Sequence, residues 1–173
     1  MERISKGFAP GSMVSQVTRN RIEGQVGRLT DGGPCRLQVA ALPWRHGPDG
    51  LEILLITSRD SGRWVLPKGW PEGREQLYDT AAREAAEEAG LNGAVAQQQI
   101  GRYFYDKGSA SRSERRCEVM VFPLEVEALA SRWPERKERT RQWFPAMEAA
   151  TLVRESELAD LIRRFAADPR PSL

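Results

Sequence analysis

The chain has 173 residues, 29% of them charged, with 26 Lys and Arg against 24 Asp and Glu and a formal net charge of +2. This length suits one domain with a substantial core, and no run approaches the roughly 20 apolar residues that span a bilayer, which argues against a membrane protein. The first residues show no apolar stretch of the signal-peptide type, so we expect no secretory leader. The two cysteines lack metal-ligand spacing and favour free thiols in a reducing compartment, so we expect a cytoplasmic protein.

Mixed α and β elements are predicted along a single domain. Residues 1–34 are rich in Gly, Ser and Arg without hydrophobic periodicity, which predicts an irregular N-terminal extension. Apolar runs then predict strands at 37–42, 51–57 and 64–66. Further elements are a helix at 77–89, strands at 95–105 and 117–126, a short strand around 143–144 and an amphipathic helix at 155–167. The folded domain is expected to cover 35–168, with a short tail at 169–173.

Three acidic residues of the predicted helix 77–89 fall on one arc. At about 100° per residue, Glu88 lies about 40° and Glu87 about −60° from Glu84, so the carboxylates can converge. The neighbouring arc is made of small residues, which would let the helix approach a sheet closely: Ala81, Ala82, Ala85, Ala86 and Ala89. Such a helix would hold its acids at a fixed height above the sheet.

Like charges at helical spacing repel each other, so a cation should compensate these three acids. Oxygen ligands suit Mg²⁺ or Mn²⁺ better than zinc, and Mg²⁺ typically takes one or two carboxylates, with water and phosphates in its other positions. The third carboxylate could then accept a proton from an attacking water. The alternative is a solvated surface helix, which this short segment alone would favour.

Upstream residues decide between these alternatives. The segment 69–91 matches the Nudix box, G-x5-E-x7-R-E-U-x-E-E-x-G-U with U aliphatic, and therefore resembles the Nudix superfamily. The fixed positions are Gly69, Glu75, Arg83, Glu84, Glu87, Glu88 and Gly90, with Ala85 and Leu91 at the aliphatic ones. Chance agreement at seven fixed positions is on the order of 10⁻⁸ per start, so the match is specific.

The resemblance implies a fold and a set of roles. The fold would be an α/β/α sandwich, with a mixed β-sheet between the box helix and a C-terminal helix. The roles carried over by position are metal ligation by Glu84, Glu88 and the backbone carbonyl of Lys68, and general-base catalysis at the metal site by Glu87. Structural roles fall to the remaining box residues, with Glu75 and Arg83 paired to brace the loop: Gly69, Glu75, Arg83 and Gly90.

Other segments bear on the substrate. Residues 57–67 and 139–144 are similar to the diphosphoinositol polyphosphate phosphohydrolases, a branch that implies basic substrate contacts at Arg36, Arg59 and Arg116. The segment 67–69, Pro-Lys-Gly, instead resembles hydrolases of diadenosine tetraphosphate. Residues 102–116 carry five basic against two acidic residues and are expected to join two strands beside the box helix, where guanidinium groups could bind phosphates.

The function expected from this resemblance is a Mg²⁺-dependent pyrophosphohydrolase, with Mn²⁺ a possible substitute. Its substrate would be a small, highly phosphorylated molecule, either a diphosphoinositol polyphosphate or a dinucleoside polyphosphate. Nucleic acid is not an expected partner, because no aromatic-interleaved basic motif occurs, and neither is a membrane. A catalytically silent sensor that binds a nucleotide is the alternative, although a sensor would not need all three acids. The sequence leaves the oligomeric state open.

Overall fold

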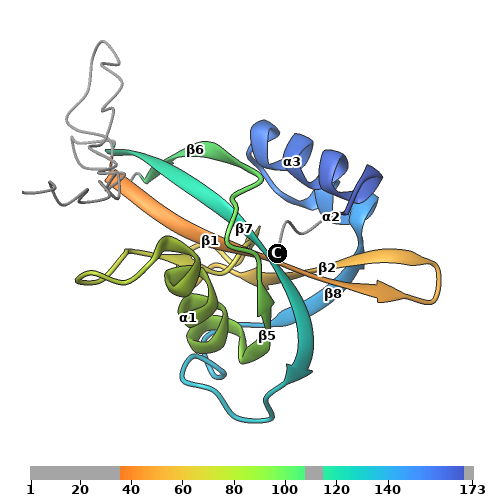
Figure 1. Ribbon diagram of the computed structural model, residues 1–173, viewed down its shortest axis with the longest axis horizontal. Coiled ribbons are helices and arrows are strands. Elements are labelled where there is room, and N and C mark those ends of the chain that lie inside the picture. Colours follow the sequence, from red (N-terminus) through yellow and green to blue (C-terminus); the bar gives the residue numbers. More distant parts are fainter. Residues whose placement is uncertain (1–35, 108–114, 170–173) are drawn as a thin grey trace, which may run out of the picture.

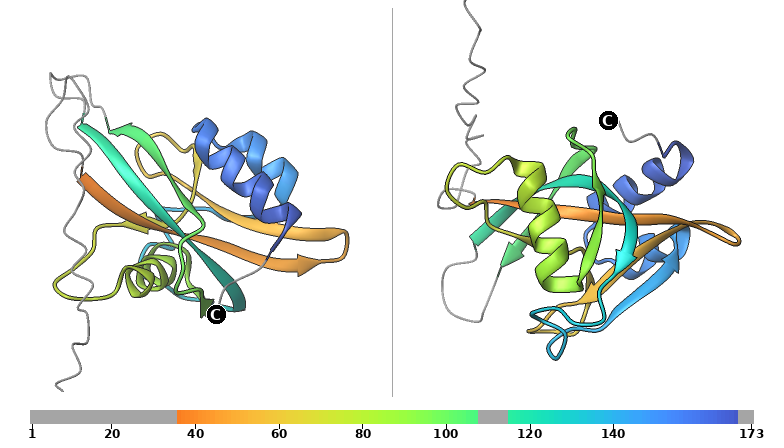
Figure 2. Two further views of the ribbon diagram at one scale, coloured as in Figure 1. Left: turned by 45° about the horizontal axis from the view of Figure 1, so that its top comes forward. Right: turned by 60° about the horizontal axis from the view of Figure 1, so that its bottom comes forward.

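The computed structural model describes residues 36–107 and 115–169, so the predicted extension 1–34 and residues 170–173 of the predicted tail lie outside the described part. Within it, one helix covers one face of a twisted sheet and two helices cover the other (Figures 1 and 2). The elements are β1 (Arg36–Gly47), β2 (Gly50–Thr57), β3 (Trp64–Val65), β4 (Lys68–Gly69), α1 (Leu77–Ala89), β5 (Leu91–Val95), β6 (Gly101–Lys107), β7 (Arg115–Leu129), β8 (Arg141–Pro145), α2 (Ala146–Leu152) and α3 (Ser156–Ala167). The predicted α/β/α sandwich with a mixed sheet is confirmed.

Strand β1 lies at the centre of the sheet. It pairs in parallel with β7 on one side and antiparallel with β2 and β4 on the other. The remaining described pairs are all antiparallel: β2 pairs with β3 and with β8, and β7 pairs with β5 and with β6. The short strand β4 holds the start of the box against β1, with Gly69 opposite Val39. The box helix α1 is therefore anchored to the middle of the sheet.

Both faces of β1 and β2 are covered, which explains their almost continuous apolar sequence. Alternate residues enter different cores: Val39 and Ala41 pack under α1, whereas Ala40 and Leu42 pack under α2 and α3. The α1 side is lined by fully buried alanines of the helix, and the α3 side by larger residues such as Phe165. None of the helices in the described residues is long and apolar enough to cross a membrane.

The strand predicted at 95–105 was wrong as one element, because the structure divides the region between two strands. β5 ends at Val95 after pairing with residues 124–129 of β7, and β6 begins at Gly101 and pairs with residues 115–121 of the same strand. The long strand β7 thus pairs with both short strands, β5 and β6. Gly101 (φ 149°) starts the second, where a side chain would meet Leu161 of α3 at about 2.4 Å.

Candidate active site

The box helix brings Glu84 and Glu88 to the edge of a buried surface. Ala81, Ala85 and Ala89 are fully buried against the sheet, and the two glutamates, one turn apart, keep only 8% and 7% of their surface exposed. The helix ends at Gly90, which adopts the left-handed conformation (φ 63°) and donates its N–H to the carbonyls of residues 85 and 86. Glu84 and Glu88 are thus held by packing of the helix on the sheet.

Glu84 is wedged between an arginine and a glycine. Its Oε1 accepts a hydrogen bond from Nη1 of Arg83 at 2.8 Å. A Cβ on Gly69 would lie about 2.1 Å from this carboxyl group, so any other residue here would force the Glu84 carboxylate to move. Burial raises the pKa of Glu84, and the charge and hydrogen bond of Arg83 oppose that rise.

Glu88 uses both carboxylate oxygens within the protein. Oε2 accepts the backbone N–H of Lys68 at 2.9 Å, and Oε1 accepts a hydrogen bond from Arg139. Burial again raises the pKa, while the Lys68 N–H and the charge of Arg139 lower it. The carboxylate is therefore oriented by two donors from different parts of the chain.

Glu87 is placed differently. Its side chain is 48% exposed, and its Oε2 lies 3.4 Å from Nη1 of Arg83. The same arginine donates from Nη2 to Oε1 of Glu75 at 3.1 Å and to the carbonyl of Trp70 at 3.0 Å. Arg83 and Glu75 thus join the loop to the helix, the contact that the resemblance implied, and hydrogen bonds from Arg83 lower the pKa of Glu75 to about 2.

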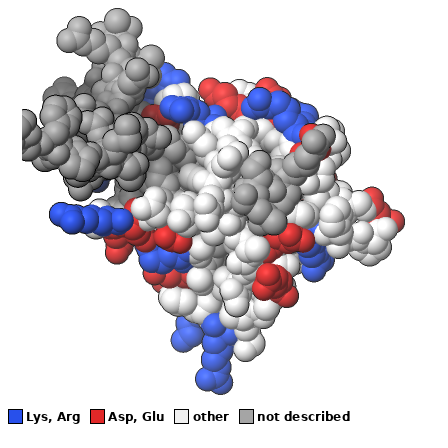
Figure 3. All heavy atoms as spheres, in the orientation of Figure 1, with Lys and Arg blue, Asp and Glu red and all other residues white. Residues whose placement is uncertain are grey.

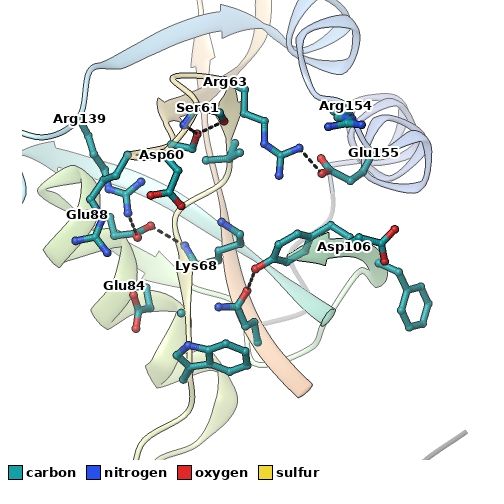
Figure 4. Close-up of a pocket in the computed structure, with 18 of the residues that line it drawn as sticks. Asp60, Ser61, Arg63, Lys68, Glu84, Glu88, Asp106, Arg139, Arg154 and Glu155 are labelled. Atoms are coloured by element: carbon teal, nitrogen blue, oxygen red, sulfur yellow. Dashed lines mark hydrogen bonds and ion pairs between the residues drawn. The ribbon is translucent and has the colours of Figure 1, made fainter. Parts of the chain in front are cut away.

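A cavity of about 940 Å³ opens beside the two buried glutamates. Figure 4 shows Glu84 and Glu88 at one side of the cavity, side chains of both signs at the other (Arg63, Arg154, Glu155 and Asp106), and Lys68 between the two sides. The described residues that line it come from most of the fold: Gln38, Ser58, Arg59, Asp60, Ser61, Arg63, Val65, Lys68, Gly69, Trp70, Glu72, Glu84, Glu88, Phe104, Tyr105, Asp106, Glu135, Arg139, Arg154, Glu155, Ser156 and Glu157. Glu84 and Glu88 belong to this lining, and Glu87 does not.

The three arginines predicted to bind substrate are not brought together. Arg59 lines the cavity, 55% exposed, and lies 3.4 Å from Glu135 and 3.3 Å from Glu138. Arg36 stacks over the ring of Trp70 at 4.2 Å, so it adjoins the lining through that ring. Arg116 lies over Phe104 at 4.7 Å and is not among the described lining residues. Part of the predicted basic segment, residues 108–114, lies outside the described chain.

Several cavity residues could not be foreseen from the sequence. Arg63 and Glu155 form an ion pair at 2.8 Å across 92 positions of sequence. The Lys68 ammonium lies 5.5 Å from the ring centre of Tyr105, and burial lowers the pKa of Lys68. Glu135 and Arg139 come from a charged segment that reads as a solvated surface. The signals at these positions were charge and, for Arg63 and Arg139, the similarity of residues 57–67 and 139–144 to one branch of the family, and neither reveals which side chains face inward.

The donor set fits a hard divalent cation. Among the described residues, no group of three His, Cys, Asp or Glu is arranged to hold a metal ion. Glu84 and Glu88, however, present two buried carboxylates, the number that Mg²⁺ commonly takes from a protein beside water and phosphate oxygens. Burial raises the pKa of both carboxylates although an arginine donates to each, and a bound cation would favour their charged forms further.

The surface charge around α1 is mixed in sign. Figure 3 shows acidic and basic side chains next to each other on the face that carries α1. Arg83 accounts for part of this pattern, because Glu72, Glu75, Glu84 and Glu87 all lie within 4 Å of its guanidinium. The acidic residues of the box are thus partly neutralised by the box's own arginine.

Comparison with known proteins identifies the class. The NUDIX domain family matches residues 36–165, so the chain belongs to this family and the predicted resemblance is confirmed. It is 35% identical to Nudix hydrolase 12, mitochondrial, of Arabidopsis thaliana over 118 residues, and this aligned region covers 66% of this chain and 58% of that protein. Diphosphoinositol polyphosphate phosphohydrolase 2 of Rattus norvegicus is 28% identical over 128 residues, covering 73% and 67%.

The chain spans less than two thirds of the length of Nudix hydrolases 12 and 13 of Arabidopsis thaliana, at 58% and 59%. Several of the relatives are named mitochondrial and one chloroplastic, so the expected cytoplasmic location stays a prediction. Among solved structures, the C. elegans Ap4A hydrolase aligns with a TM-score of 0.58 at 20% identity, covering 79% of this chain and 99% of that one. The NUDIX domain of Shewanella oneidensis NrtR, complexed with ADP ribose, aligns with a TM-score of 0.58 at 17% identity, covering 76% and 88%. Likeness at this level shows the fold.

Proposed function

We propose that the chain is a Mg²⁺- or Mn²⁺-dependent pyrophosphohydrolase that cleaves a phosphoanhydride bond in a small, highly phosphorylated molecule. The observation that carries the proposal is the pair of buried box carboxylates, Glu84 and Glu88, at one side of a cavity that is also lined by basic side chains. Carboxylates bind the cation that phosphate chemistry needs, and guanidinium groups bind phosphate oxygens. Both requirements meet in one cavity.

Glu84 and Glu88 would hold the cation, with the backbone carbonyl of Lys68 as the further ligand that the family resemblance implies. When bound, the cation supplies charge neutralisation at the cleaved phosphate and lowers the pKa of a bound water. The protein's own part is to orient these two carboxylates and to exclude bulk water from the cavity. Arg154 would bind the remaining phosphates on the opposite wall, together with Arg63, whose Nη1 also donates to Glu155 at 2.8 Å.

The proposed general base is Glu87, as the resemblance implies. Glu135 is a second candidate for the general base, because it lines the cavity and Glu87 does not. The backbone links the two: the N–H of Glu135 donates to the carbonyl of Glu87 at 3.2 Å. The site therefore offers Glu87 beside the ligands on the helix, and Glu135 as one of the acids that line the cavity from other segments.

Two substrate classes fit the proposal. The relative named diphosphoinositol polyphosphate phosphohydrolase 2 and the fold neighbour named Ap4A hydrolase support inositol pyrophosphates and dinucleoside polyphosphates, respectively. Trp70 lines the cavity and could stack on a base, which an inositol substrate lacks. A hydrolysis panel with Mg²⁺ or Mn²⁺ over both classes, nucleotide sugars and nucleoside triphosphates tests the proposal, and product analysis gives the phosphorus attacked.

The alternative is a catalytically silent domain that binds a nucleotide. One observation favours it: both oxygens of Glu88 already accept hydrogen bonds from the protein. Binding of a panel compound without any metal-dependent product release would support this alternative. Product release that requires the cation would exclude it.

A further inference from the structure

Arg139 is a buried arginine outside the Nudix box whose guanidinium is surrounded by protein. It lies between β7 and β8, and its side chain is only 7% exposed. Nη1 donates to the carbonyl of Thr57 at 3.1 Å, Nε donates to Glu135, and Nη2 donates to Oε1 of Glu88. Figure 4 shows the guanidinium directed at Glu88 from the side opposite Lys68.

The arrangement around Glu88 parallels the arrangement around Glu84. Arg83 donates to Glu84 and is itself held by the carboxylate of Glu75 and the carbonyl of Trp70. Arg139 donates to Glu88 and is likewise held by a second carboxylate and a backbone carbonyl. Each buried glutamate of the site thus accepts a hydrogen bond from one arginine, and that arginine also donates to a second carboxylate and to a backbone carbonyl.

This burial argues against a role for Arg139 as a solvated surface charge or as a direct contact to the substrate. Arg139 lines the cavity, but each of its three guanidinium nitrogens already donates to the protein, and turning the group toward a phosphate would leave Glu88 and Glu135 with fewer donors. Breaking a buried ion pair in this way is costly. Its geometry suits holding one carboxylate oxygen in place, which a planar, forked donor does well.

We propose that Arg139 is a positioning residue that fixes Glu88 for divalent-cation binding, as Arg83 does for Glu84. The inference rests on the proposed function, in which Glu88 is a metal ligand. Groups that orient metal ligands typically change metal affinity by 10–100-fold when they are lost. Lysine keeps the charge but has one compact ammonium, so it cannot reproduce three directed contacts.

The test is a titration of the full chain with Mn²⁺, followed by electron paramagnetic resonance of the free ion, in the wild type, R139K and E88Q. We expect R139K to weaken Mn²⁺ binding about 10–100-fold. The matched control is R136K, because Arg136 is an exposed neighbour that lies over Trp133. We expect it to bind Mn²⁺ like the wild type. R139Q, a neutral variant that keeps a planar donor, replaces R139K if that variant does not fold.

The possible outcomes distinguish the positioning role of Arg139 from the proposed function. Unchanged Mn²⁺ affinity in R139K would reduce Arg139 to a structural role, and tighter binding would show that Arg139 competes with the cation for Glu88. Either result overturns the inference and leaves the proposed function standing. Equal Mn²⁺ binding by the wild type and E88Q would overturn both claims, because Glu88 would then be no ligand.

Discussion

Glu87 differs from the other two box acids in its surroundings. It is half-exposed, whereas Glu84 and Glu88 are buried. We expect Glu87→Gln to keep the fold and Mn²⁺ binding but to lower kcat at least 10²-fold, the usual scale for a general base. Steady-state rates at saturating metal check this.

The matched variant is Glu135→Gln, because Glu135 lines the cavity and its N–H donates to the carbonyl of Glu87. We expect it to lower kcat less than Glu87→Gln does. A large loss in the Glu135 variant together with near-normal turnover in the Glu87 variant would assign the base to Glu135 instead.

The contact between Glu75 and Arg83 predicts a specific pH dependence of stability. The pKa of Glu75 falls from 4.5 to about 2 in the folded protein, so its contribution to stability is complete above about pH 4.5 and is lost as the pH falls through about 2. The difference in unfolding free energy between the wild type and Glu75→Gln should therefore shrink between these two values. Urea denaturation at several pH values measures it.

The exposed Glu127 provides the control for this titration. Glu127→Gln should differ little from the wild type at every pH. A difference for Glu75→Gln that stays constant from pH 6 to pH 2 would show that the brace does not depend on the charge of Glu75.

The sequence predicted which acids of the box lie together, because a helical period relates Glu84, Glu87 and Glu88 directly. It could not predict their partners from other segments. Arg139 lies 51 positions from Glu88, and only the pairing of distant strands brings it there. The exposure of Glu87 compared with Glu88 was also hidden, since both fall on the same arc and only packing against β1 and β4 distinguishes them.

The box helix is the element that matched its prediction most closely, with bounds at Leu77 and Ala89. Good helix formers followed by a glycine give a local signal that needs no tertiary information. Strand β4 was missed, because a two-residue strand carries too little periodicity to recognise. Strand β7 extends beyond its predicted 117–126 because it pairs with β1, β5 and β6 along its length.

Arg141 fastens the C-terminal end of the box helix. Its Nη1 donates to the carbonyls of Ala89 and Gly90, its Nη2 donates to Ala130, and the guanidinium stacks on Trp133 at 3.9 Å. A cation at this end also interacts favourably with the helix dipole. We expect Arg141→Met to lower the unfolding free energy by about 1–3 kcal/mol, measured by chemical denaturation.

The control for this prediction is Arg136→Met. Arg136 also lies over the ring of Trp133, at 5.9 Å, but from an exposed position. We expect it to change stability by less than about 0.5 kcal/mol. Equal losses in the two variants would mean that stacking on Trp133, rather than capping of the helix, is what Arg141 contributes.

At the scale of the whole molecule, the site joins elements from both sides of the sheet. Glu84 and Glu88 come from α1, whereas Arg154 and Glu155 come from the connection between α2 and α3 on the opposite layer. A cation bound to the folded state alone should stabilise all of them together, by about 2.7 kcal/mol at a concentration 100 times its Kd. For a domain of this size the melting temperature should rise by roughly 5–10 °C.

Thermal unfolding with and without Mn²⁺ measures this rise, and Glu88→Gln should largely abolish it. The variant also removes a buried charge, so each protein is compared with its own metal-free melting temperature. An equal rise in both proteins would place the cation elsewhere on the molecule.

The most direct test of the central claim is the metal dependence of hydrolysis. Product release from inositol pyrophosphates and dinucleoside polyphosphates is followed over a Mg²⁺ titration with the wild type and Glu88→Gln. The account predicts saturable, Mg²⁺-dependent cleavage of a phosphoanhydride bond in at least one class, reduced at least 10²-fold in the variant at the same Mg²⁺ concentration. Cleavage that proceeds equally without a divalent cation, or equally in the variant, would contradict it.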